Sequence, residues 1–202
     1  MRRTVMTAAA SVALLISGLV SVAAQTPGTN TWTIDSGHST AGFSVKHLMV
    51  STVRGTLGPI KGTIAYDGRS LESIKIDASI DMSAINTGNE SRDRDLKGTE
   101  FFDVAKFPAA TFKSTRVEPA GAGKFRLIGD LTMRGVTKEV TLTVEGPSPV
   151  VKAQNGQKIG ASATTTLNRR DFGLEYNNMV EAVPVVSDEV QVTIDIEANK
   201  KG

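Results

Sequence analysis

The segment Ile74-Lys75-Ile76-Asp77-Ala78-Ser79-Ile80-Asp81-Met82 alternates apolar and polar side chains with a period of two. In an extended chain this period sends successive side chains to opposite faces, so it predicts a β-strand with one buried face. The same alternation recurs in other parts of the chain, at residues 43–47, 125–131, 136–144, 159–167 and 190–196.

Turn-forming residues separate these segments and favour antiparallel neighbours. They occur at Asp67-Gly68, residues 119–123, Arg134-Gly135 and Asn155-Gly156. Strand, turn and strand at this spacing predict an antiparallel all-β domain, and the residues alone leave a sandwich and a barrel open.

One segment does not follow the strand pattern. Thr87-Gly88-Asn89-Glu90 fits a helix capping box, and Gly98 suits the position just past a helix end. A short, mostly solvated helix is therefore expected near residues 88–97. No stretch is rich enough in Pro, Gly or Ser to act as a linker, so residues 25–202 are expected to form a single domain.

The first residues have the layout of a secretory signal peptide. Arg2 and Arg3 precede an apolar stretch at residues 5–20, and Val22-Ala23-Ala24 offers a cleavage site before Gln25. The stretch is shorter than the roughly 20 apolar residues that span a bilayer. We therefore expect residues 1–24 to be removed and the mature protein to have no stable membrane span.

Charge and composition exclude several functional classes. The chain has 23 basic and 21 acidic residues, and loss of Arg2 and Arg3 makes the two equal. No long-range field remains to attract nucleic acid, so no nucleic-acid partner is expected. The absence of cysteine excludes a thiol nucleophile, a zinc–cysteine site and an iron–sulfur cluster.

Catalytic groups are sparse. The chain has two histidines, His38 and His47, and neither lies in a metal-binding or catalytic motif. We therefore expect no enzyme activity and no metal site. The alternative is an enzyme that acts on a lipid or quinone through His47 and a nearby acid, Asp77 or Asp103.

The apolar residues leave two kinds of interior open. Four of the seven phenylalanines lie between Phe101 and Phe112. A small closed barrel has room for packed side chains or for one small ligand, and periodicity does not distinguish them. A filled barrel would suit a stress-related structural protein.

Several blocks of sequence, in order, resemble the YceI-like family. They cover almost all of the chain from Trp32 to Glu197: His38 to His47 with Val53-Arg54-Gly55, Arg92-Asp93 with Leu96-Lys97, Phe101 to Val104, Phe107 to Phe112, Gly129 to Lys138, and Arg170 to Leu174.

This resemblance implies a lipocalin-like antiparallel β-barrel in the bacterial periplasm. It also implies an apolar tunnel that binds a polyisoprenoid, an isoprenoid quinone or a similar long-chain lipid. The lipid would be the ligand, and no cofactor is expected. The sequence leaves a homodimer open.

The expected ligand-binding residues follow from the resemblance together with strand parity. The tunnel wall is assigned to Phe43, Val45, Ile76, Ile80, Leu131, Met133 and Phe172. One end is assigned to Phe101, Phe102, Phe107 and Phe112. For each residue, ordinary barrel packing is the alternative.

Five polar residues have separate expected roles. His47 shares the parity of Phe43 and Val45, so it is either a head-group ligand or a satisfied core histidine. Arg54 and Arg134 are expected to pair with acidic residues across the barrel, and contact with the ligand is the alternative. Asp35 and His38 are expected to organise the entry into the first strand.

Overall fold

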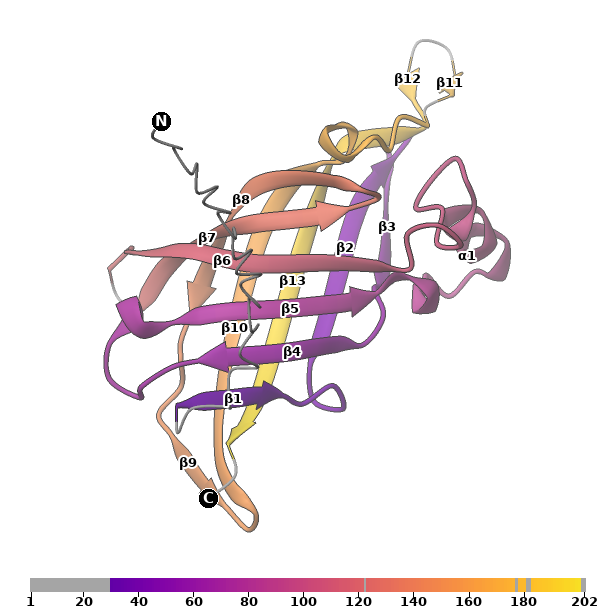
Figure 1. Cartoon of the computed structure of the whole chain (residues 1–202). Coiled ribbons are helices and arrows are strands. Elements are labelled where there is room, and N and C mark those ends of the chain that lie inside the picture. The colour runs from indigo at the N-terminus through magenta and orange to yellow at the C-terminus, as the bar shows by residue number, and fades with distance from the viewer. Residues whose placement is uncertain (1–29, 122, 177, 181–182, 201–202) are drawn as a thin grey trace, which may run out of the picture.

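The computed structural model describes residues 30–121, 123–176, 178–180 and 183–200 (Figure 1). The expected signal peptide, residues 1–24, lies outside this part of the chain. The elements are β1 (Thr31–Ile34), β2 (Thr40–His47), β3 (Ser51–Thr56), β4 (Ile60–Ala65), the 3-10 helix η1 (Leu71–Ser73), β5 (Lys75–Asp81), η2 (Met82–Ala84), α1 (Glu90–Lys97), β6 (Ala109–Pro119), β7 (Lys124–Met133), β8 (Val136–Glu145), β9 (Val151–Ala153), β10 (Gly156–Asn168), η3 (Arg169–Phe172), β11 (Met179–Val180), β12 (Val183–Pro184) and β13 (Val186–Lys200).

Eight antiparallel strands close into a barrel. Their order around it is β13, β1, β4, β5, β6, β7, β8 and β10, and β10 pairs again with β13. This closing pair extends from Gln157 opposite Lys200 to Asn168 opposite Glu189. The all-β, lipocalin-like barrel expected from the sequence is confirmed.

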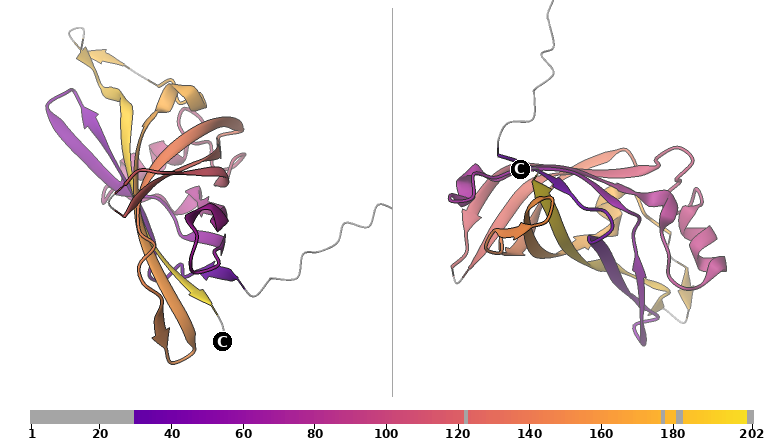
Figure 2. Two further views of the ribbon diagram at one scale, coloured as in Figure 1. Left: turned by 90° about the vertical axis from the view of Figure 1, so that its left-hand side faces the viewer. Right: turned by 90° about the horizontal axis from the view of Figure 1, so that it is seen from below.

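One edge of the long strand β13 pairs with β10, and its other edge pairs with two different strands. Near its C-terminal end Asn199 pairs with Thr33 of β1, whereas Ile194 pairs with Ala41 of β2. The β2–β3 hairpin therefore extends the sheet beyond the closed barrel (Figure 2).

Alternation explains why these segments form strands. In β13 the apolar residues Val192, Ile194 and Ile196 face the interior, while Gln191 and Thr193 are exposed. Such a pattern buries one face of a strand and solvates the other. All six predicted segments lie in strands, namely β5, β2, β7, β8, β10 and β13.

The predicted short helix is present as α1, but its cap differs from the expected one. Asn89, not Thr87, is the N-cap, and its side chain accepts a hydrogen bond from Arg92 N at 3.0 Å. Thr87 instead donates from its backbone and its hydroxyl to the Asp93 carboxylate. The charged helix has no buried residue, as its composition predicts.

Side-chain packing fills one end of the barrel, which we call the Trp32 end. Trp32 is 1% exposed, and its Nε1 donates to the Tyr66 carbonyl at 3.1 Å. The buried cluster at this end comprises Trp32, Tyr66, Ile74, Phe125, Leu127, Leu142, Val144, Ile159 and Ala198. Strand β10 runs from Ile159 in this cluster to η3, so η3 marks the opposite end.

Candidate functional site

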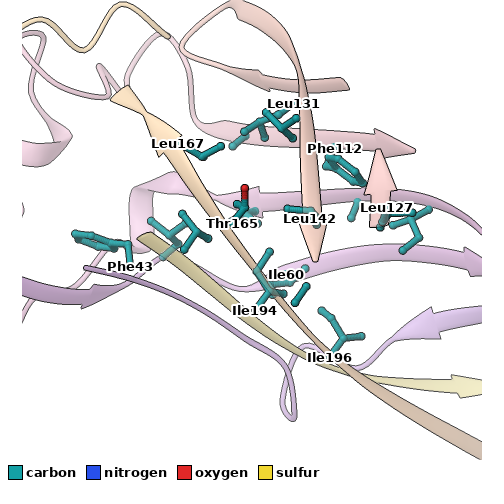
Figure 3. A pocket seen from close by; sticks show the side chains of 18 of the residues that line it. Phe43, Ile60, Phe112, Leu127, Leu131, Leu142, Thr165, Leu167, Ile194 and Ile196 are labelled. Atoms are coloured by element: carbon teal, nitrogen blue, oxygen red, sulfur yellow. The ribbon is translucent and has the colours of Figure 1, made fainter. Parts of the chain in front are cut away.

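An apolar cavity of about 260 Å³ occupies the barrel interior. Inward side chains from the barrel strands and β2 line it, and Figure 3 shows residues such as Phe112, Leu142 and Ile194 pointing into it. Small inward side chains, including Ala161 and Ala163 of β10, leave part of the space unfilled.

The cavity opens toward the η3 end. Lining residues near Trp32, such as Phe125 and Ile159, are buried. Lining residues nearer η3, such as Val45, Met133 and Leu167, are half-buried, so the mouth of the cavity lies there. The loop after α1 and the segment after η3 meet at this end.

Most of the predicted ligand-binding residues lie on the cavity wall. Nine of the twelve line it: Phe43, Val45, Ile76, Ile80, Phe101, Phe102, Phe112, Leu131 and Met133. Phe101 and Phe102 reach it from the loop after α1, whereas Phe112 belongs to strand β6. Whether these residues contact a ligand stays a prediction.

The other three predicted residues lie outside the lining. His47 is exposed at the end of β2, in the β2–β3 hairpin that extends beyond the closed barrel, so its shared parity with Val45 does not place it in the cavity. Phe107 packs over Gly135 in the β7–β8 turn. Phe172 is buried in η3.

The two catalytic pairs considered from the sequence are not assembled. Asp77 is exposed on β5, and Asp103 lies in the loop after α1. Within the described part of the chain, no hydrogen bond or ion pair joins His47 to either acid.

Arg134 does not form the expected ion pair. It donates from Nη1 to the Gly173 carbonyl and from Nη2 to the Thr99 carbonyl at 2.8 Å. Its position at the β7–β8 turn explains the difference, because two chain segments present backbone oxygens there. Arg54 is exposed, and the ion pairs between described residues do not include it.

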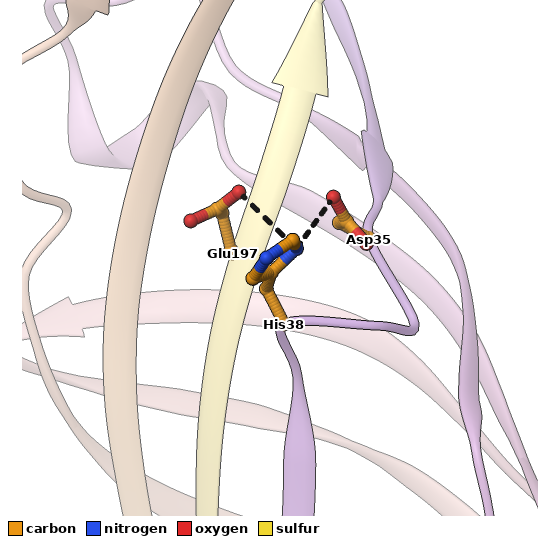
Figure 4. A group of neighbouring side chains, drawn as sticks. All are labelled: Asp35, His38 and Glu197. Carbon is orange, nitrogen blue, oxygen red and sulfur yellow. Dashed lines mark hydrogen bonds and ion pairs between the residues drawn. The ribbon is translucent and has the colours of Figure 1, made fainter.

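Asp35 and His38 organise the turn before β2, which contains the first strand predicted along the chain (residues 43–47), as expected. The Asp35 carboxylate accepts from Asn199 Nδ2 at 2.9 Å, from His38 Nδ1 at 3.1 Å and from Gly37 N at 3.0 Å. These hydrogen bonds, that from Asn199 most of all, lower the pKa of Asp35 to about 2. Glu197 lies beside His38 (Figure 4).

This cluster has the residue types of a metal site. The ligand atoms of Asp35, His38 and Glu197 lie within 4.8 Å of one another. However, the Lys158 ammonium contacts Glu197 Oε1 and lies 3.9 Å from Asp35 Oδ2. Lys158 thus supplies the positive charge that a metal ion would otherwise supply.

One charged residue of the cavity lining was not predicted from the sequence. Arg169 is 5% exposed and is the charged residue among those that line the cavity in the described chain. The inward position of Arg169 was predictable from the sequence, because Arg169 continues the alternation that places Thr165 and Leu167 inside the barrel. Burial lowers the pKa of its guanidinium, while Asp188 raises it.

None of the helices in the described residues combines the length and apolar composition needed to cross a membrane.

Comparison with known proteins gives consistent results. The family model of the YceI-like domain matches residues 32–198. A UPF0312 protein of Staphylococcus aureus (strain MSSA476) is 34% identical over 151 residues, which cover 74% of this chain and 85% of that protein. A UPF0312 protein of Vibrio vulnificus (strain YJ016) is 33% identical over 137 residues, covering 68% and 72%.

Solved structures share the barrel. The YCEI protein of Campylobacter jejuni superposes with a TM-score of 0.66 and 32% identity, covering 78% of this chain and 90% of that one. A polyisoprenoid binding domain from Saccharophagus degradans has a TM-score of 0.62 and 17% identity, covering 84% and 98%, and shares the fold. The family model and the relatives above 30% identity, taken together, show that this chain belongs to the YceI-like family.

Proposed function

We propose that the protein binds a long-chain apolar lipid, a polyisoprenoid or an isoprenoid quinone, in the barrel cavity. The observation that carries the proposal is the cavity itself, an apolar space of about 260 Å³ that opens at one end. Its volume lies just below the range typical of small-molecule pockets, roughly 300–1,000 Å³. The fold shared with a polyisoprenoid binding domain supports the same ligand class.

The hydrophobic effect supplies the binding free energy. Micromolar affinity requires about 8 kcal/mol net, and association costs at least about 4 kcal/mol. Each buried CH₂-sized group contributes about 0.8 kcal/mol. About fifteen such groups, which is about three isoprene units, are therefore enough for micromolar binding. The lipid is the ligand of the protein, and its binding needs no cofactor.

The proposed location is the periplasm. The support is the signal-peptide layout of residues 1–24, which precede the family domain. Fractionation of cells that express the full chain, with mass spectrometry of the N-terminus, tests the location. A cytoplasmic protein that retains Arg2 and Arg3 would contradict it.

Extraction of the purified protein tests the ligand. Native mass spectrometry and organic extraction are expected to identify a co-purified apolar molecule. Protein that is empty and takes up no isoprenoid would contradict the proposal.

A pair of neighbouring substitutions on β10 makes this test specific for the cavity. Ala163 lines the cavity, whereas Thr164 is exposed on the opposite face of the strand. Ala163→Phe is expected to block lipid uptake because its ring occupies the cavity. Thr164→Phe adds a similar side chain outside and is expected to leave uptake unchanged. Equal uptake by both variants would place the lipid elsewhere.

A further inference from the structure

Two hairpins expose large apolar side chains at the mouth end of the barrel. The β2–β3 hairpin and the β11–β12 hairpin lie at the same end of the molecule (Figure 1 and Figure 2). Met49 is 58% exposed and Val50 86% in the first, and Met179 is 59% exposed and Val180 51% in the second. We call these four residues the apolar tips. Exposed apolar residues gathered at one place are typical of an interaction surface.

The turn of the β2–β3 hairpin holds apolar residues in a backbone conformation that disfavours them. Leu48 and Met49 have φ values of 49° and 57°, and Val50 N donates to the His47 carbonyl at 3.0 Å. Glycine and asparagine are the usual residues in hairpin turns with positive φ, because a Cβ is crowded there. Stability alone would favour Asn-Gly at this turn. The apolar side chains at the tip therefore point to a role outside the fold.

The two hairpins are joined to each other and to the cavity wall. Leu48 N donates to the carbonyl of Val185, the residue directly after β12, at 3.0 Å. The next residue, Val186, pairs with His47 and lines the cavity. Leu48 and Val185 are half-buried. An apolar path thus leads from the exposed tips through these two residues to the interior of the barrel.

We propose that the apolar tips insert into the surface of a lipid bilayer, so that the cavity mouth faces the membrane while the ligand enters or leaves. The inference rests on the proposed lipid-binding function and adds the source of the ligand. Each CH₂-sized group lowers the solubility of a lipid in water by roughly fourfold, so a long isoprenoid resides in membranes. Transfer from the bilayer directly into the mouth avoids passage through water.

The size of the surface favours a bilayer over a protein partner. A stable protein interface takes about 20–30 residues from each side. The apolar tips are four large side chains on two narrow hairpins. A bilayer needs no matching shape, because its hydrocarbon is fluid and buries each inserted side chain separately. Apolar side chains that enter the boundary between head groups and acyl chains hold interfacial helices on membranes in the same way.

Labelling at single cysteines tests the contact, because the chain has no cysteine of its own. Val50→Cys and Val151→Cys are each labelled with a polarity-sensitive dye and mixed with vesicles of phosphatidylcholine, a zwitterionic lipid. Val151 is the matched control, since it is 57% exposed in the β9–β10 hairpin, near the Trp32 end. Lipids with brominated acyl chains are expected to quench the dye at position 50 and not at position 151. Equal quenching at the two positions, or none at position 50, would overturn the inference.

Polar substitution of one tip gives a second test. The double variant Met49→Asn with Val50→Ser keeps the turn, because asparagine tolerates a positive φ. It is expected to bind vesicles at least about tenfold more weakly, since burial of one Val or Met side chain changes an equilibrium constant by about that factor. Val150→Ser with Val151→Ser, which removes two exposed apolar residues near the other end, is expected to bind as the wild type does. Equal binding by the two double variants would contradict the inference.

Transfer of farnesol separates this inference from the proposed function. The wild type is expected to extract farnesol from vesicles at a rate that rises with vesicle concentration, and the tip variant is expected to be slower. Both proteins should bind farnesol equally when it is added from ethanol. Binding from ethanol with a transfer rate independent of vesicle concentration would keep the function and overturn the membrane contact. No binding from ethanol would overturn the function, and dye quenching would then decide the contact alone.

Sedimentation of the wild type without vesicles tests the alternative occupant. The protein is expected to sediment in the same way as the variant with Met49→Asn and Val50→Ser. A dimer that this variant dissociates would assign the apolar tips to a second copy of the chain and overturn the inference.

Discussion

The ring of Phe101 lies against the ring of Tyr176, with 4.7 Å between their centroids and 40° between their planes. Phe101 lines the cavity from the loop after α1, and Tyr176 belongs to the segment after η3. The pair joins these two segments at the mouth of the cavity, so its strength bears on how readily a ligand enters or leaves.

Removal of this contact is expected to accelerate ligand release. Tyr176→Ala should raise the dissociation rate of farnesol and lower the free energy of unfolding by about 1 kcal/mol, the usual value of an aromatic pair. Tyr176→Phe keeps the ring and should resemble the wild type in both measurements. Stopped-flow displacement and urea denaturation give the two values. Equal rates for the Ala and Phe variants would contradict a role of the ring pair.

Trp32→Phe is expected to lower the free energy of unfolding by about 2–3 kcal/mol. The smaller ring leaves unfilled space in a site that is 1% exposed, and the Tyr66 carbonyl loses its donor. Denaturation followed by circular dichroism measures the loss. Lys200→Met is the control, because it removes only an ammonium that lies 5.4 Å from the Trp32 ring centroid. Lys200→Met should lower the free energy of unfolding by less than about 1 kcal/mol. A larger loss in Lys200→Met than in Trp32→Phe would contradict the packing role assigned to Trp32.

Gly129→Ala is expected to destabilise the barrel more than Gly160→Ala. A Cβ at Gly129 would lie 2.5 Å from the Lys113 carbonyl oxygen and 2.6 Å from the Phe112 ring. A Cβ at Gly160 would meet only the Ile196 carbonyl oxygen, at 3.4 Å. Thermal denaturation of the two variants compares them directly. Similar melting temperatures would show that β6 and β7 move apart without cost.

Acid is expected to weaken the fold partly through Asp35. Its pKa is about 2 in the folded protein against an ordinary value of 3.8, because Asn199, His38 and Gly37 donate hydrogen bonds to the carboxylate. A lowered pKa stabilises the fold above pH 3.8, and this stabilisation is lost as the pH falls toward 2.

Asp35→Asn should therefore flatten the dependence of unfolding free energy on pH within that window. Urea denaturation at a series of pH values measures the slope. An NMR titration of Asp35 that gives an ordinary pKa would contradict the assignment.

The period of two predicts most of the barrel because it depends only on neighbours in the chain. Residues 74–82 predict β5 for this reason. Strand β1, with four residues, is too short for a periodic signal. The pairing of β13 with β1 joins the two ends of the domain, with Thr33 opposite Asn199, and no local pattern contains that information.

The site was predicted less completely than the fold. Parity placed Phe43 and Val45 on the cavity wall but failed two residues later at His47, where the β2–β3 hairpin extends beyond the closed barrel. Parity extended along β10 would have found Arg169. The presence of open space was beyond sequence reasoning, because it depends on how far side chains such as Ala161 and Ala163 fall short of their neighbours across the barrel.

The double pairing of β13 has a consequence for how the protein is made. Every strand that β13 joins is translated before it, and β10 and β1 have no shared partner until β13 lies between them. A chain in which β13 has not yet paired therefore carries an open sheet with its apolar face uncovered. Loading with lipid has to wait until residues 186–200 have paired with both neighbours and closed the wall.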